Sequence, residues 1–177
     1  MRDLLCKASF WIRNIPNRMR EFTQGSVNSN GIFKAVGEWR MTFIREDGSF
    51  VDHGVVSRRI VTDAALTYFA AAMVSGGATA SAFNHFRSGT GTAAETAADS
   101  ELQTPVGTRL TGTQSSALGV YSTTCTIPYT AGYTITEVAI HSASTSGTCL
   151  DRALVTAQAV TNGQAIKFDY TLTLTRA

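Results

Sequence analysis

The stretch from Ala165 to Thr175, AIKFDYTLTLT, decides the fold class of this chain of 177 residues. Apolar residues alternate in it with lysine, aspartate and threonine. Successive side chains of a β-strand point to opposite faces, so this alternation places one apolar face against a core and one polar face toward solvent. The apolar face consists of Ile166, Phe168, Tyr170, Leu172 and Leu174.

A turn signal stands just before this strand. Asn162-Gly163 is a dipeptide that tolerates positive φ at both central positions of a tight turn. The sequence therefore predicts a hairpin in which Asp151 to Thr161 forms the other arm.

Most of the remaining chain is also typical of short strands separated by turns. A hairpin is expected around Glu46-Asp47-Gly48-Ser49, with Trp39 to Ile44 before it and Phe50 to Arg58 after it. Strands of this length with turn signals between them favour a mainly β fold, an antiparallel β-sandwich or barrel. The other expected strands are Ala82–Ser88, Val106–Thr113, Leu118–Ile127 and Thr134–Ser142.

One helix is expected at about residues 62–75. Thr62 can cap its first turn, Asp63 suits the positive end of the helix dipole, and Gly76-Gly77 can end it. The helix is apolar nearly all round, which predicts that it is largely buried against the sheet. Ala97 to Gln103 is expected to form one or two further helical turns.

Composition places the chain among globular proteins. Hydrophobic residues make up 44% and charged residues 16%, below the roughly 25% charged residues of typical soluble domains. The net charge of +2 does not suggest direct nucleic-acid binding. The longest mostly apolar stretch, Ala64 to Val74, is too short to span a bilayer, so no membrane association is expected. The start of the chain lacks the pattern of a secretory signal, which predicts a soluble protein made in the cytoplasm.

Residues 1–30 differ from the rest and are expected to form an N-terminal arm and linker, followed by a single β-sandwich domain over residues 31–177. The arm mixes large apolar residues with arginines, a composition typical of interface anchors. A short helix packed on the chain's own domain is an equally open alternative. The candidate interface residues are Phe10, Trp11, Arg13, Arg18, Met19, Arg20 and Phe22.

Candidate chemistry is sparse. The Gly89-Thr90-Gly91-Thr92 run lacks the lysine of a phosphate-binding loop and is expected to be a surface loop. The carboxylates are scattered, Asp47 is expected to be a turn residue, and Asp151-Arg152 is expected to form at most a local ion pair. No catalytic residue is predicted, and the chain is not expected to be an enzyme.

The cysteines and histidines also give no indication of catalysis or metal binding. His53, His85 and His141 show no paired ligand spacing, so neither a metal nor another cofactor is expected. Cys125 or Cys149 could in principle pair with His141 as a thiol nucleophile, but a small buried hydrophobe is the default role. A disulfide between these two cysteines is left open.

Several of these segments together resemble structural proteins of tailed-bacteriophage virions. In those proteins a strand leads into a Gly-Thr-Gly-Thr loop and an acidic turn, and a later strand carries Ile-Thr-Glu-Val before a small-residue turn and an arginine. The matching runs here are Phe86 to Thr92, Ala98 to Thr104, Ile135 to Ile140, and Gly147 with Leu150-Asp151-Arg152. The likeness covers about residues 33 to 175, and the first thirty residues show none.

The resemblance implies a homo-oligomeric virion protein, made in the host cytoplasm, whose partners are the major capsid protein or other virion proteins. Small size and the arm favour a decoration or cement protein that bridges capsid subunits. Tail, connector and fibre-attachment proteins are alternatives in the same class. An alternative of another class is a glycan- or receptor-binding module that uses Tyr121, Tyr129 and Tyr133.

Overall fold

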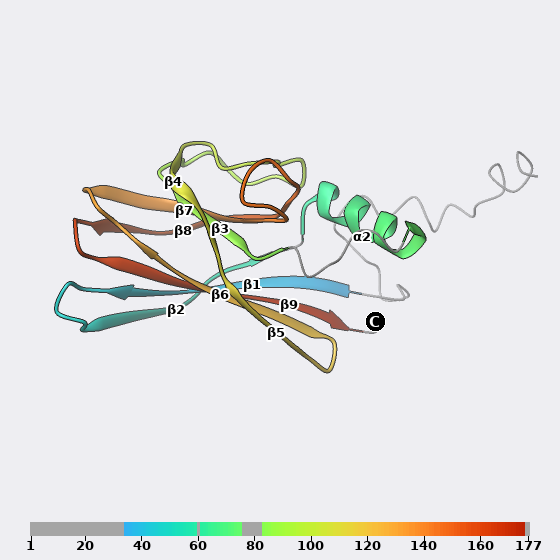
Figure 1. Cartoon of the computed structure of the whole chain (residues 1–177), viewed down its shortest axis with the longest axis horizontal. Helices are drawn as coiled ribbons and strands as arrows, with labels where there is room; N and C mark the ends of the chain where they lie inside the picture. Colours follow the sequence, from blue (N-terminus) through green and yellow to red (C-terminus); the bar gives the residue numbers. More distant parts are fainter. Residues whose placement is uncertain (1–33, 60, 76–82, 176–177) are drawn as a thin grey trace, which may run out of the picture. The chain divides into compact units, whose positions relative to one another are not determined.

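The chain folds as two antiparallel β-sheets packed face to face (Figure 1). The structure is a computed structural model, and it describes residues 34–59, 61–75 and 83–175. The five-stranded sheet has the order β2-β1-β9-β6-β5 and the four-stranded sheet the order β4-β3-β7-β8. The elements are β1 (Lys34–Ile44), β2 (Phe50–Arg59), α2 (Asp63–Ser75), β3 (His85–Gly89), β4 (Pro105–Thr111), β5 (Thr113–Ala117), β6 (Val120–Pro128), β7 (Tyr133–His141), β8 (Cys149–Val160) and β9 (Ala165–Thr175). The predicted β-sandwich is confirmed, and the alternative of a closed barrel is wrong.

Aromatic side chains from both sheets meet in the core between them. Trp39 of β1 is fully buried and lies edge-on to Phe86 of β3, with ring centroids 5.8 Å apart. Phe168 and Tyr170 of β9 pack beside it. Edge-to-face aromatic pairs add to the burial of apolar area, so Trp39 is a main link between the sheets.

The alternation in β9 is confirmed with one exception. Ile166, Phe168, Tyr170 and Leu172 are buried on the inner face of the five-stranded sheet. Leu174 continues the pattern in sequence but is 51% exposed. Periodicity alone therefore overestimates the core at this end of the strand.

The predicted hairpin at Asn162-Gly163 is wrong. β8 belongs to the four-stranded sheet and β9 to the five-stranded sheet, so the turn carries the chain from one sheet to the other. Gly163 has φ of +85° and donates its N–H to the Tyr129 carbonyl at 3.0 Å. The Tyr129 N–H in turn donates to the Gln164 carbonyl at 2.9 Å. The dipeptide therefore makes the expected turn, but β9 pairs along its length with β6 and not with β8.

The strand predicted over Val106–Thr113 also changes sheet. It divides at Gly112 into β4 of the four-stranded sheet and β5 of the five-stranded sheet. A Cβ atom at position 112 would lie 2.6 Å from the Thr124 carbonyl oxygen and 2.8 Å from the Phe86 ring. Only glycine therefore fits at the point where the chain crosses between sheets.

The predicted helix is confirmed at Asp63–Ser75, and Thr62 caps it. The Thr62 hydroxyl accepts the Ala65 N–H at 3.1 Å and donates to the Cys149 carbonyl at 2.6 Å. Burial is one-sided, however: Ala65 is buried, Leu66, Tyr68 and Phe69 are partly buried, and the other positions in residues 63–71 are exposed. The expectation of a largely buried helix is therefore too strong, because aspartate, threonine and small alanines make up the exposed side. The expected end at Gly76-Gly77 lies outside the described residues.

Candidate functional site

The outer face of the four-stranded sheet carries a charged layer that is covered by residues 90–104, here called the cover segment. Strand alternation in β7 sends Val138 and Ile140 into the core and Glu137, Ala139 and His141 to the outer face. In Figure 1 the cover segment is the yellow-green trace that passes over β7 and β8. The predicted helical turns at Ala97–Gln103 are wrong, because the segment consists of turns and bends.

Glu137 is the main anchor of the cover segment. Its side chain is fully buried and accepts backbone N–H groups from Gly91 at 3.0 Å, Gln103 at 3.1 Å and Thr104 at 2.8 Å. Burial raises the pKa of a carboxyl group, but these hydrogen bonds and the one from Arg152 outweigh burial and lower the pKa of Glu137. Glu137 is therefore a carboxylate that holds both ends of the cover segment on the sheet.

Arg152 of β8 completes this anchor. Its side chain is fully buried, and Nε donates to Glu137 at 2.8 Å. Its two terminal nitrogens donate to Asp99 and to the Ala93 carbonyl, each at 3.0 Å. One guanidinium thus pairs with both a strand carboxylate and a cover-segment carboxylate through charge-assisted hydrogen bonds, which offset the cost of burying it.

Other contacts tie down the rest of the cover segment. Glu95 pairs with Arg59 and accepts the Leu154 N–H of β8 at 2.6 Å. Thr136 donates its hydroxyl hydrogen to the Gly91 carbonyl at 2.7 Å. Leu102 is buried against Ala139 and Cys149. The segment is therefore bound by both polar and apolar contacts along its length.

The Gly89-Thr90-Gly91-Thr92 run is not the plain surface loop expected from the sequence. A Cβ atom at Gly89 or at Gly91 would lie 2.5 Å from Glu137 Oε1, so both glycines permit the approach to this carboxylate. Glycine-rich loops bind anions through their N–H groups. Here the anion that receives the Gly91 N–H is a side chain of the protein itself.

A second group of charges lies at the other end of the same face. Glu101 pairs with Arg109, which also donates to the carbonyls of Ala143 and Ser146. His141 Nε2 lies 3.1 Å from Glu101 Oε1. Burial lowers the pKa of His141 to about 4 although Glu101 opposes this shift, so the imidazole is neutral at pH 7.

The two described cysteines are free thiols, so the open disulfide alternative is wrong. Cys149 is the register partner of His141 across β7 and β8, the arrangement that a thiol nucleophile would need. Burial raises the pKa of Cys149 well above its usual value, and the nearby carboxylate of Asp151 raises it further. A covered, protonated thiol is the opposite of an activated nucleophile.

Asp151 and Arg152 do not form the local ion pair that their adjacency suggested. Arg152 points to the outer face, whereas Asp151 points between the sheets and accepts the Trp39 Nε1–H at 3.0 Å. Burial raises the pKa of Asp151 to about 7, although hydrogen bonding from Trp39 lowers it in part. Asp47, by contrast, is confirmed as a turn residue, because it accepts the Ser49 N–H at 2.9 Å.

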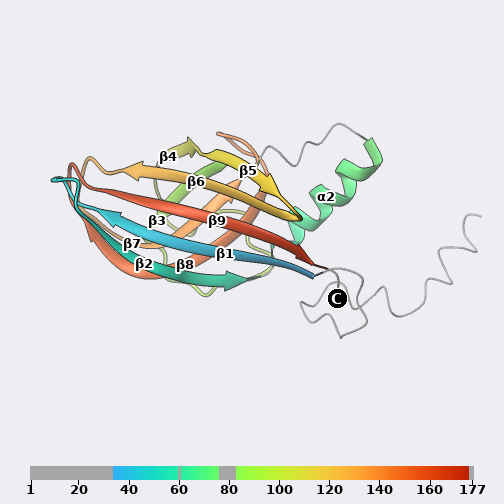
Figure 2. The same cartoon turned by 90° about the horizontal axis from the view of Figure 1, so that it is seen from below.

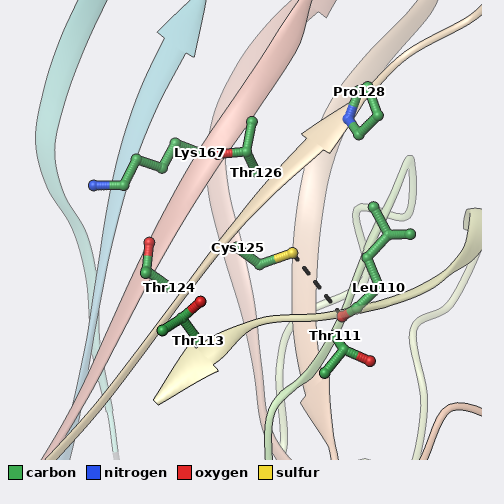
Figure 3. Close-up of a pocket in the computed structure, with 8 residues that line it drawn as sticks. All are labelled: Leu110, Thr111, Thr113, Thr124, Cys125, Thr126, Pro128 and Lys167. Atoms are coloured by element: carbon green, nitrogen blue, oxygen red, sulfur yellow. Dashed lines mark hydrogen bonds between the residues drawn. The ribbon is translucent and has the colours of Figure 1, made fainter. Parts of the chain in front are cut away.

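A groove lies where the chain passes from β4 to β5, beside Thr113 at the start of β5 (Figure 3). It has a volume of about 530 Å³, and four threonine side chains contribute to its walls. Cys125 lies in it with Sγ directed toward the Leu110 carbonyl at 3.9 Å. Burial raises the pKa of Cys125 to about 11, so this thiol is also not activated. The lining residues are Leu110, Thr111, Thr113, Thr124, Cys125, Thr126, Pro128 and Lys167.

The tyrosines considered for glycan binding are mostly engaged internally. Tyr129 is buried and its hydroxyl lies 2.9 Å from the Ser88 hydroxyl. Tyr121 donates to the Phe83 carbonyl at 2.5 Å. Tyr133, 38% exposed, is the most accessible of these three, so they do not form an open aromatic platform.

The predicted interface residues all lie in residues 1–33, outside the described part of the chain. The predicted boundary between arm and domain also lies there. Sequence reasoning missed Glu137 and Arg152 as partners. The available signal was a glutamate inside the apolar run ITEVAI, since a charge in a buried strand requires a partner.

Comparison with known families, characterised proteins and solved structures finds no match to the chain. In the described part, no three His, Cys, Asp or Glu side chains form a group suited to a metal ion. The one described helix is too short to cross a bilayer.

Proposed function

We propose that the chain is a structural protein of a bacteriophage particle, acting as a decoration or cement subunit that bridges capsid proteins. One observation supports this role above the others. The four runs that resemble virion proteins converge on a single unit, in which Glu137 and Arg152 hold the cover segment against the sheet. These runs therefore serve to build a rigid surface, and their charged groups are used internally.

The chemistry of the outer face also favours a contact protein over a catalyst. Glu137, Asp99 and Arg152 are paired and buried, and the thiol and imidazole of this face are uncharged at pH 7. A protein that binds only the assembled capsid stabilises that state by mass action. The buried ion pairs of this face are already ordered, so they lose little side-chain entropy on binding.

The decisive experiment is quantitative mass spectrometry of purified particles from the phage that encodes the chain, with the major capsid protein as internal standard. A decoration subunit is expected in numbers comparable to the capsid lattice. A count corresponding to a single ring would assign the chain to the connector or tail instead. Absence from particles would reject the virion proposal altogether.

Capsid stability provides an independent test. Particles that lack the protein should rupture at a lower temperature than decorated particles, and adding back purified protein should restore the rupture temperature. Adding an Arg152→Ala variant should restore it less well, because the cover segment would no longer be held. Equal rupture temperatures with and without the protein would contradict a cementing role.

A further inference from the structure

β5 is the least protected strand edge in the described part of the chain. It is the last strand on one side of the five-stranded sheet, and its register with β6 is regular (Figure 2). The chain carries no charged residue from Leu110 to Thr136, a run that includes all of β5 and β6. In an antiparallel strand, about half of the backbone N–H and C=O groups point away from the paired neighbour. The outer side of β5 is therefore a template for another strand.

The other edges in the described chain carry the usual protections. β2 has charged residues along it and two register shifts with β1. β4 begins at Pro105 and contains Gly107, whose φ is +62°, where its register with β3 shifts. The Leu154 N–H of β8 donates to Glu95 of the cover segment, and the part of β6 that β5 leaves unpaired ends in Pro128. Proline, bulges, charges and covering loops discourage pairing, and β5 shows none of them in the described chain.

The β5–β6 hairpin ends in an exposed leucine with an unusual backbone conformation. Ala117 pairs with Val120, so Leu118 and Gly119 form a two-residue turn. Leu118 has φ of +48°, a region that glycine, asparagine and aspartate adopt far more readily than leucine. Its side chain is fully exposed. A large apolar side chain kept in this conformation and in solvent indicates a contact surface, because it does not favour the turn itself.

The sequence of β5 is complementary to a second copy of itself. When two β5 strands lie antiparallel about a two-fold axis at Ser115, Thr113 faces Ala117 and all five residues of the strand are paired. The strand has no charged residue, so no like charges meet across the axis. The same register places Leu118 of each copy opposite Gly112 of the other copy.

Gly112 lies at the crossing from β4 to β5, directly beside the groove. Thr111 and Thr113 flank it and line the groove, and Leu110 adds an apolar side chain to the lining (Figure 3). Apart from one lysine, the lining residues carry no charge. The groove, of about 530 Å³, is therefore suited to an apolar side chain. One two-fold axis thus brings the exposed Leu118 of each copy to the groove of the other.

We propose that two copies of the chain join by antiparallel pairing of their β5 strands about Ser115, with each Leu118 seated in the groove of the other copy. The two five-stranded sheets then form one continuous sheet in a dimer with a self-complementary interface. This inference deepens the proposed function by naming the partner and the surface through which subunits assemble, and it rests on that function only for its biological context.

Opposite charges placed at the axis test the pairing. Ser115 is exposed, so neither Ser115→Lys nor Ser115→Glu should disturb the core. The full chain should be a dimer by light scattering after size exclusion. Each variant alone sets two like charges opposite each other and should raise the dissociation constant by about tenfold or more, whereas the one-to-one mixture should form a heterodimer. Thr130→Lys is the matched control, because this exposed threonine lies outside β5 and the groove, and it should remain a dimer.

Leu118→Asn tests the second contact. Asparagine adopts positive φ readily, so the turn is retained and the monomer should keep its thermal stability. Two leucine side chains would leave the interface, so the dissociation constant of the dimer should rise about a hundredfold. Amide exchange should be about tenfold slower in the dimeric full chain than in this variant at alternate residues of β5, where N–H groups point to the second copy.

The remaining outcomes each overturn the inference. A full chain that stays monomeric, with fast exchange in β5, would show that the edge is unpaired. Dimers that persist unchanged in both Ser115 variants would place the contact elsewhere, and a mixture that stays monomeric would reject the axis at Ser115. Unchanged dissociation in Leu118→Asn would reject the seating of the leucine, and dissociation by the control would reject the role of β5. The particle count tests the proposed function separately, because a protein absent from particles could still form this dimer.

Discussion

The two faces of β8 each bury an ionisable side chain, Arg152 on the outer face and Asp151 on the inner face, but they stabilise it differently. On the outer side, Arg152 is surrounded by two carboxylates and a carbonyl that together use all of its nitrogens. On the inner side, Asp151 has the Trp39 indole as its hydrogen-bond partner and lies beside the Tyr170 hydroxyl. Glu137 on the outer side therefore has a lowered pKa, whereas burial on the inner side raises the pKa of Asp151 to about 7. A buried charge is stable in this fold where backbone and side-chain partners converge on it.

Among the substitutions that test this comparison, removal of the Arg152 side chain should lower the free energy of unfolding most. Arg152→Ala leaves Glu137 and Asp99 buried without their cation, and breaking a buried pair in this way costs about 3–5 kcal/mol. Urea denaturation should show this loss in the free energy of unfolding. Arg58→Ala is the control, because its ion pair with Glu38 is exposed and should contribute less than about 1 kcal/mol. Similar losses for both variants would contradict the assigned role of the outer layer.

Gly91→Ala should cause the second largest loss of stability, because the added methyl group would push the cover segment away from Glu137. The added methyl group would lie 2.5 Å from Glu137 Oε1 and 2.6 Å from Gln103 Cβ. Overpacking of this kind typically costs about 1–3 kcal/mol. Thermal denaturation and amide exchange of the cover segment would measure it. Gly132→Ala is the matched control, since its nearest neighbour would be 3.8 Å away and its stability should be almost unchanged.

The inner layer can be tested by pH. The folded pKa of Asp151, about 7, lies above the value of about 3.9 for an unfolded chain, so the folded state holds this proton more tightly. Its contribution to stability is therefore fully present below about pH 4 and is lost as the pH rises toward 7. The wild type should lose about 2 kcal/mol relative to Asp151→Asn between pH 5 and pH 7.5. A constant difference between the two proteins over this range would refute the raised pKa.

His141 should make stability depend on pH in the opposite direction and by a smaller amount. Its folded pKa of about 4 lies below its unfolded value of about 6.5, so the unfolded chain binds the proton first as the pH falls. Stability should decrease by about 1.5 kcal/mol between pH 6.5 and pH 5, relative to a His141→Gln variant. Proton titration of the imidazole by NMR gives a direct check. A His141 pKa near 6.5 in the folded protein would contradict this prediction.

Local features of the fold were predicted well from the sequence. The period of two in β9, the Thr62 cap and the Asp47 turn each depend on residues close together in the chain, and each is present in the structure. The cover segment was predicted poorly. Its turns and small helix formers suggested a short helix, but its conformation is set by Glu137 and Arg152, which lie more than thirty residues further along the chain.

The candidate site was visible in sequence only as separate fragments. The acidic run at Asp99, the glutamate at 137 and the arginine at 152 were each noted, yet nothing local shows that they meet. Adjacency was even misleading, because Asp151 and Arg152 point to opposite sides of one strand. The groove could not be predicted either, since it exists because β5 is shorter than β6 and the chain crosses between sheets at Gly112.

The sequence by itself determined that the chain is mainly β, where its strong turns fall and which face of β9 is apolar. Backbone geometry produces these features residue by residue, so a short stretch of sequence is enough to predict them. Tertiary structure alone decided that β8 and β9 belong to different sheets and that the Asp151 and Arg152 side chains enter different layers. It also decided that β5 pairs with only part of β6. These features depend on residues far apart in the chain. The alternating pattern of a strand predicts that it pairs with another strand, but it does not specify which one.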